Sequence, residues 1–133
     1  VGHYKKNHII INLVTSIILT GFTLWLLGIF ISNAVFSEAL GVSEPSLHIG
    51  LIAFGILYSP ISGITGFLMS VLSRKFEYQA DNFAKNTYAG DPLITSLKKL
   101  SRNNLSNLTP HPLYVKLHYS HPTLLQRYRN LKA

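Results

Sequence analysis

Two long uncharged stretches dominate the pattern of hydrophobic and polar positions along the chain. Residues 9–31 are 23 consecutive residues without a charged side chain, and residues 49–72 are 24. A helix needs about 20 apolar residues to cross the hydrocarbon core of a bilayer, so each stretch predicts a transmembrane helix. Pro60 lies in the second stretch, and membrane helices tolerate such a proline. A soluble core of 133 residues could not enclose two helices of this kind.

The last third of the chain predicts further helices. Residues 73–89 place Glu77 and Asp81 four apart, which makes them neighbours on one helix face. A second helix is expected over about 92–103, and residues 104–121 are expected to be irregular or extended because prolines punctuate them. A final helix is expected over about 122–131, with its proline at the first position. The predicted fold class is therefore all-α: an integral membrane protein with two transmembrane helices, followed by a cytoplasmic helical tail.

The charges lie outside the two uncharged stretches. Residues 1–8 carry two lysines, and residues 74–133 carry ten Lys or Arg against three acidic residues, whereas the loop at 32–48 has no Lys or Arg. The positive-inside rule then predicts that both ends are cytoplasmic. We expect a multi-pass protein of a bacterial inner membrane, or of the endoplasmic reticulum if the source is eukaryotic.

Composition excludes several other classes of protein. Charged residues make up only 13% of the chain and the mean hydropathy is +0.26, which is incompatible with intrinsic disorder. The absence of cysteine rules out disulfides and thiolate metal sites. The basic tail contains neither an aromatic-basic RNA motif nor a zinc finger, so no nucleic-acid partner is expected.

A candidate metal site follows from depth in the membrane. His3 lies six residues before the first stretch and Glu77 five residues after the second, so an antiparallel helix pair brings them to a similar level. A His and a Glu side chain together suit a divalent cation such as Zn²⁺, although a solvated or ion-paired arrangement is the simpler interpretation. His8 is five residues from His3 and would not share its helix face, so we interpret it as an interfacial histidine. No role is predicted for Gln79.

Three sequence segments carry a resemblance to a known family. VGHYKKNH resembles the end of an HExxH motif in its H-E-x-G-H form, and FEYQAD (76–81) resembles an E-x-x-x-D element. The basic tail contains LTPHPLYVKLHYSHPTLLQR (108–127). These three segments, in this order around two apolar spans, closely resemble the type 1 CAAX prenyl proteases, which are integral-membrane zinc endopeptidases. The resemblance covers essentially the whole chain, as the C-terminal third of such a protein.

The resemblance implies roles at matching positions. His3 would be the second His ligand of zinc and Glu77 the third protein ligand. Asp81 would hold a zinc-ligating His by a hydrogen bond. His121, in YSHP, would lie near the bound substrate and hold its backbone or the developing oxyanion, and Arg127 would support that region. The implied reaction is peptide hydrolysis, and the family substrate is a peptide or protein with a prenylated C-terminal CAAX segment.

The same resemblance implies that catalytic groups are missing. The first His ligand and the general-base Glu would precede Val1, which would be the third residue of the motif. The 133 residues would then form the C-terminal part of one metallopeptidase domain and should be inactive alone. In that part, residues 1–8 would end the zinc helix, 9–72 would hold both spans and their loop, and 73–133 would lie in the cytoplasm.

Two alternatives stay open. A membrane quality-control metalloprotease of the HtpX kind also places two spans between HExxH and E-x-x-x-D. The segment over residues 40–62 looks like bacterial members of the family, for which a farnesylated CAAX substrate is not expected. A non-enzymatic two-span scaffold, with a basic tail that contacts anionic lipid, is the alternative from a different functional class.

Overall fold

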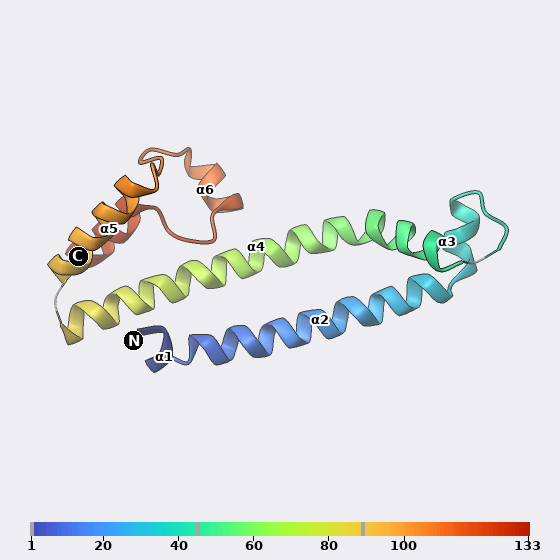
Figure 1. Cartoon of the computed structure of the whole chain (residues 1–133), viewed down its shortest axis with the longest axis horizontal. Coiled ribbons are helices and arrows are strands. Elements are labelled where there is room, and N and C mark those ends of the chain that lie inside the picture. The colour runs from blue at the N-terminus through green and yellow to red at the C-terminus, as the bar shows by residue number, and fades with distance from the viewer. Residues whose placement is uncertain (1, 45, 89) are drawn as a thin grey trace. The chain divides into compact units, whose positions relative to one another are not determined.

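The computed structural model describes residues 2–44, 46–88 and 90–133. Val1, and with it the predicted third position of the HExxH motif, lies outside the described residues. The described part is α-helical without strands, as the sequence predicts (Figure 1). Its helices are α1 (Gly2–Lys5), α2 (His8–Ser32), α3 (Ala34–Ala39), α4 (Leu47–Thr87), α5 (Gly90–Asn103), α6 (Pro112–His118) and α7 (Leu124–Lys132).

The chain forms two compact units. One unit contains residues 10–65, and the other contains residues 1–9 together with 66–133. The predicted candidate site residues all fall in the second of these, which we call the site unit. We call residues 10–65 the apolar unit.

In the apolar unit, helices pack through aromatic rings and a close backbone approach. The ring of Phe30 stacks on Phe36 at 4.3 Å and meets Phe54 edge-on at 5.7 Å. A Cβ atom added to Gly50 would lie 2.8 Å from the Cα of Ile31, so the absence of a side chain permits this contact. Glycine at such a position is needed for backbone approach rather than for flexibility.

The two uncharged stretches do fall in helices that are long and apolar enough to cross a membrane. An 18-residue stretch of α2 has a mean hydropathy of 2.1 and none of it is buried. The corresponding stretch of α4 has a mean hydropathy of 1.7, and 6% of it is buried. Helices that are apolar around their whole circumference and unburied require an apolar solvent. The prediction of two candidate transmembrane helices is confirmed on these grounds.

The second span and the helix expected after it form one continuous helix. α4 runs for 41 residues and passes through Pro60 without ending. The prediction separated residues 49–72 from 73–89 because the charge pattern changes there. Charge does not interrupt a helix, and no Gly or Pro stands at this boundary.

Residues 104–121 are predicted to be irregular or extended, but part of this segment is helical. The segment contains α6, which starts at Pro112 after His111. Proline is favoured at the first helical position, because that position needs no hydrogen-bonded N–H. The prediction for this segment treats its prolines only as helix breakers, whereas Pro112 begins α6.

The last helix begins later than predicted. α7 starts at Leu124 rather than Pro122, because Thr123 is its N-cap. The Thr123 hydroxyl accepts a hydrogen bond from the Gln126 backbone N–H, and the Gln126 side chain accepts one from the Thr123 N–H at 2.9 Å. This reciprocal capping box satisfies two backbone donors and fixes the start of the helix.

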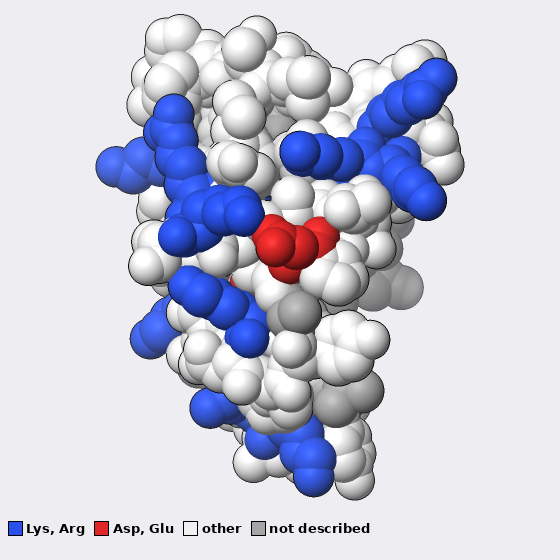
Figure 2. Space-filling model, turned by 90° about the vertical axis from the view of Figure 1, so that its left-hand side faces the viewer, with Lys and Arg blue, Asp and Glu red and all other residues white. Residues whose placement is uncertain are grey.

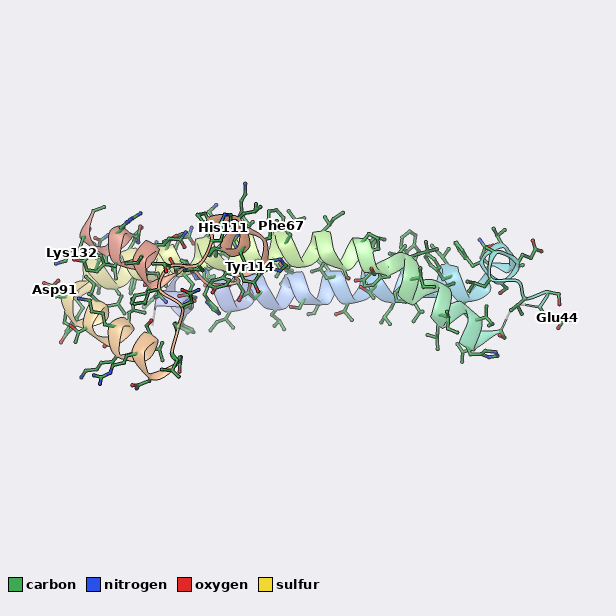
Figure 3. The ribbon with its side chains drawn as sticks, turned by 90° about the horizontal axis from the view of Figure 1, so that it is seen from above. Glu44, Phe67, Asp91, His111, Tyr114 and Lys132 are labelled. Atoms are coloured by element: carbon green, nitrogen blue, oxygen red, sulfur yellow. The ribbon has the colours of Figure 1, made fainter. Side chains whose placement is uncertain are left out.

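α5 and α7 pack together in the site unit. Ile94 on α5 and Leu131 on α7 are buried, and residues 74–133 of the unit carry ten Lys or Arg. Figure 2 shows blue Lys and Arg side chains around a small red area. The Nζ of Lys132 lies 2.8 Å from Oδ1 of Asp91, and Figure 3 shows the two labelled side chains next to each other.

Candidate metal centre

Arg127 joins the two carboxylates of the E-x-x-x-D element. Its Nε donates to Asp81 Oδ2 at 2.9 Å and its Nη2 donates to Asp81 Oδ1 at 2.5 Å. Its Nη1 lies 3.0 Å from Glu77 Oε2. Glu77 and Asp81 are one helical turn apart on α4, so one guanidinium from α7 reaches both.

The other oxygen of Glu77 faces two histidines. Nε2 of His3 lies 3.7 Å from Glu77 Oε1, and Nδ1 of His121 lies 3.2 Å from the same atom. The Glu77 side chain is only 14% exposed, whereas those of His3 and His121 are 45% and 67% exposed. The sequence-predicted residues His3, Glu77, Asp81, His121 and Arg127 thus meet in one cluster.

The distance between His3 and Glu77 suits two ligands of one zinc ion. Bonds of about 2.0–2.2 Å at a tetrahedral angle separate a nitrogen and an oxygen ligand by roughly 3.3 Å. The observed 3.7 Å needs a shift of only a few tenths of an ångström. Within the described residues no group of three His, Asp or Glu side chains is arranged to hold a metal. His3 and Glu77 thus fit as two ligands of a larger set and not as a complete metal site.

His8 is not interfacial, and that prediction is wrong. The residue is 1% exposed, and its ring stacks on Phe76 with centroids 4.1 Å apart. Its Nδ1 lies 3.1 Å from the Nδ1 of His3. The prediction assumed one helix from His3 to His8, but Asn7 has φ = 58° and separates α1 from α2. This left-handed residue turns His8 back toward His3.

Gln79 has a contact that sequence reasoning missed. Its Oε1 lies 2.8 Å from the Nε2 of His8. No pattern indicates this pair, because the residues are 71 positions apart and Gln79 occupies an unspecified position of the E-x-x-x-D element. The close approach of α1 to α4 is visible at Gly2, where an added Cβ would lie 3.1 Å from the Cα of Ala80.

Arg74 holds the segment that precedes His121. Its Nη1 donates to the carbonyl oxygen of Tyr119, and its Nη2 donates to that of Lys116 at 3.2 Å. Lys116 lies in the last turn of α6 and Tyr119 is its C-cap, where C=O groups lack helical partners. Arg74, which belongs to no predicted site, thereby helps to place His121 beside Glu77.

The ion pairs affect the protonation of this region. Burial by itself lowers the pKa of Arg127, but hydrogen bonds to Asp81 and the charges of Asp81 and Glu77 outweigh it and raise the pKa above its ordinary value. Burial is also the main cause that raises the pKa of Tyr78. Arg127 therefore stays a cation in any accessible buffer.

A cavity of about 680 Å³ opens beside Glu77. Its lining includes Leu97, Ser101, His121 and Arg127. The Ser101 hydroxyl is buried and makes no hydrogen bond to the described residues. Leucines form part of the wall, but most of the lining residues are polar, so the cavity can offer hydrogen-bond donors and acceptors to a bound peptide.

Comparison with known proteins identifies the family. The family model described as peptidase family M48 matches residues 1–133. The chain belongs to peptidase family M48. Two curated relatives are similar to this M48 chain: the human CAAX prenyl protease 1 homolog is 36% identical over 134 residues, and CAAX prenyl protease 1 of Saccharomyces cerevisiae is 35% identical over 142 residues.

The fold of this M48 chain resembles a solved structure. The crystal structure of S. mikatae Ste24p matches with a TM-score of 0.84 and 32% identity, over 99% of this chain and 34% of that one. The human relative is covered to 28% and the S. cerevisiae relative to 31%, by 99% and 96% of this chain. The M48 chain therefore spans about a third of the length of these relatives, and the family resemblance found in the sequence is confirmed.

Proposed function

We propose that this chain is part of a membrane-embedded, zinc-dependent endopeptidase, whose substrate class is a peptide with a prenylated C-terminal CAAX segment. The observation that carries the proposal is the approach of His3 Nε2 to Glu77 Oε1 at 3.7 Å, from positions 74 apart in the sequence. The names of the similar relatives support the substrate class.

His3 and Glu77 would hold the zinc ion, with another His ligand and a general-base Glu expected from outside these 133 residues. When bound, zinc polarises a scissile carbonyl and lowers the pKa of a bound water. Arg127 holds Glu77 Oε2, which leaves Oε1 turned toward His3. The described contacts of Asp81 are to Arg127, so Asp81 anchors the guanidinium. A hydrogen bond from Asp81 to a zinc-ligating His stays a prediction.

His121 is the candidate substrate contact. Its side chain is 67% exposed and lies at the cavity that also touches Glu77. A ring N–H there can donate to a peptide carbonyl or to the oxyanion that forms from it. Arg127 also lines the cavity but is largely occupied by the carboxylates, so its support is mainly indirect.

The bilayer supports the same function. Two candidate spans are joined through the loop at 32–48, and all Lys and Arg residues lie outside residues 9–72. This distribution favours cytoplasmic placement of both ends. A prenyl chain partitions into lipid, so a site close to the membrane surface would receive such a substrate from the bilayer.

The decisive experiment measures bound zinc and peptidase activity of the purified full-length protein in detergent. Glu77→Ala should lose both, whereas Glu44→Ala, which removes an exposed glutamate, should lose neither. Substrates are a farnesylated CAAX peptide and the same peptide without the lipid. A zinc-free protein that is indifferent to Glu77→Ala would indicate a membrane scaffold, and cleavage that ignores the prenyl group would indicate a broader protease of the HtpX kind.

A further inference from the structure

His8 occupies a buried position in which both of its ring nitrogens have a partner. Nδ1 faces His3 Nδ1 at 3.1 Å, and Nε2 faces Gln79 Oε1 at 2.8 Å. Phe76 covers the ring face, so the ring cannot tilt freely. A histidine that is 1% exposed and bonded at both nitrogens has a single favourable orientation.

Because the Gln79 amide presents its oxygen to His8, each ring proton has one consistent position. The Gln79 oxygen only accepts, so the Nε2 of His8 carries the hydrogen. The neutral His8 ring then has a lone pair on Nδ1, and His3 must donate to it from its own Nδ1–H. The Nε2 of His3 consequently carries a lone pair, and this is the nitrogen that faces Glu77 at 3.7 Å.

We propose that His8 and Gln79 are positioning residues that hold His3 in the one tautomer able to bind a metal through Nε2. The inference rests on the proposed zinc site and adds the support of one of its ligands. An imidazole binds a metal only through an unprotonated nitrogen, and a hydrogen bond at its other nitrogen fixes tautomer and ring direction. Here that hydrogen bond goes to another histidine, whose own proton is fixed by a glutamine.

The reverse proton order would disable the ligand. If a donor faced the Nε2 of His8, this nitrogen would accept, and His8 Nδ1 would carry the hydrogen. His3 would then accept at Nδ1 and carry its proton on Nε2, which could not bind zinc. The tautomer of His3 thus depends on Gln79, at a position of the E-x-x-x-D element that the motif leaves unspecified.

The test measures zinc dissociation constants of full-length variants by competition with a chromophoric chelator. His8→Leu should weaken zinc binding by about 10- to 100-fold, the usual effect of removing such a supporting bond. His8→Asn should stay within a few-fold of wild type, because its Oδ1 is attached to Cγ as Nδ1 is in histidine and can accept from His3. In His8→Gln the amide is attached one carbon farther from the backbone, so its oxygen does not replace Nδ1. This variant should bind zinc as weakly as His8→Leu. His111→Leu, at an exposed histidine, is the matched control.

Thermal melting of the zinc-free proteins separates a positioning role from a structural one. If His8→Leu does not fold, the comparison of His8→Asn with His8→Gln decides. Equal zinc affinity in wild type and in all folded His8 variants, with affinity still lost in Glu77→Ala, would overturn the relay and leave the proposed function intact. Absence of zinc binding by the wild type would overturn the proposed function and the relay with it.

Discussion

The guanidinium of Arg127 and the carboxylate of Asp81 form a two-bond ion pair, with Nε–Oδ2 at 2.9 Å and Nη2–Oδ1 at 2.5 Å. The Asp81 side chain is 1% exposed and that of Arg127 is 18% exposed, so neither charge has much access to water. The pair fastens α7 to α4. The third nitrogen of the same guanidinium is at Glu77, which couples the packing of α7 to the orientation of the candidate zinc ligand.

Arg127→Met should destabilise the protein by about 3–5 kcal/mol, because it leaves the buried charge of Asp81 without its partner. The free energy of unfolding in detergent, from a denaturant titration, measures this. Arg129→Met, at an exposed arginine on the same helix, should change it by less than about 0.5 kcal/mol. The double variant Arg127→Met with Asp81→Leu should be more stable than Arg127→Met alone, and strict additivity of the two losses would contradict the buried-pair explanation.

Thr123→Ala should destabilise the protein by about 1 kcal/mol, since it removes the side-chain acceptor that caps α7. Thr95→Ala is the matched control, because Thr95 is exposed within α5 and its hydroxyl only bonds back to the Asp91 carbonyl. That change should be neutral or slightly stabilising, as alanine favours helix. Equal melting temperatures for the two variants would argue against the capping box. Because Arg127 lies on α7, zinc affinity should fall with Thr123→Ala as well.

Gly50→Ala should destabilise the apolar unit by about 1–3 kcal/mol, because the new Cβ would meet backbone at 2.8 Å. Gly55→Ala, in the same helix, provides the control: an added Cβ there meets nothing within 4 Å. Unfolding of both variants in detergent or lipid bicelles compares the two sites. A Gly50→Ala protein as stable as Gly55→Ala would mean that α2 and α4 do not approach closely at Ile31.

The Asp91–Lys132 pair gives a pH dependence whose sign is fixed. The hydrogen bond and the charge of Lys132 lower the pKa of Asp91 below 3.8, so its contribution to stability is present above that value and disappears as pH falls through the folded-state pKa. The same partner raises the pKa of Lys132 above 10.5, so its contribution is present below that value and disappears as pH rises through the folded-state pKa.

The melting temperatures of wild type and Asp91→Asn should therefore differ most at neutral pH and converge at strongly acidic and strongly alkaline pH. The difference should be small and should shrink at high salt, because both side chains are exposed. A difference that grew toward acidic pH would contradict this assignment. Glu38→Gln, at an exposed carboxylate elsewhere in the chain, serves as the control.

Local pattern was enough to predict the two long apolar helices and one face of the site, but not the short helices α3 and α6. The two uncharged stretches predicted α2 and the first part of α4, because a helix that crosses a bilayer needs about 20 consecutive apolar residues. The four-residue spacing of Glu77 and Asp81 reported a shared helix face for the same kind of reason. The family resemblance placed Arg127 near His121, but neither the resemblance nor any spacing rule predicted its ion pair with Asp81, which is 46 positions away.

The support of the site could not be predicted from local pattern. His8 becomes buried only because Phe76 and Gln79 on α4 enclose it, and Arg74 finds its carbonyl partners on α6. A left-handed backbone conformation at an asparagine is allowed but not required, so the turn at Asn7 leaves no periodic trace. Each of these features depends on packing between segments that are distant in sequence.

The left-handed turn at Asn7 also makes this stretch intolerant of changes in length. In an uninterrupted helix, residues five apart point about 140° away from each other and are about 7.5 Å apart along the axis. The turn cancels this offset for His3 and His8, whose nitrogens meet at 3.1 Å. A single inserted or deleted residue between them would rotate one histidine away from the other, whatever its identity. The spacing of residues 3–8 is therefore as much a part of the site as the side chains that it carries.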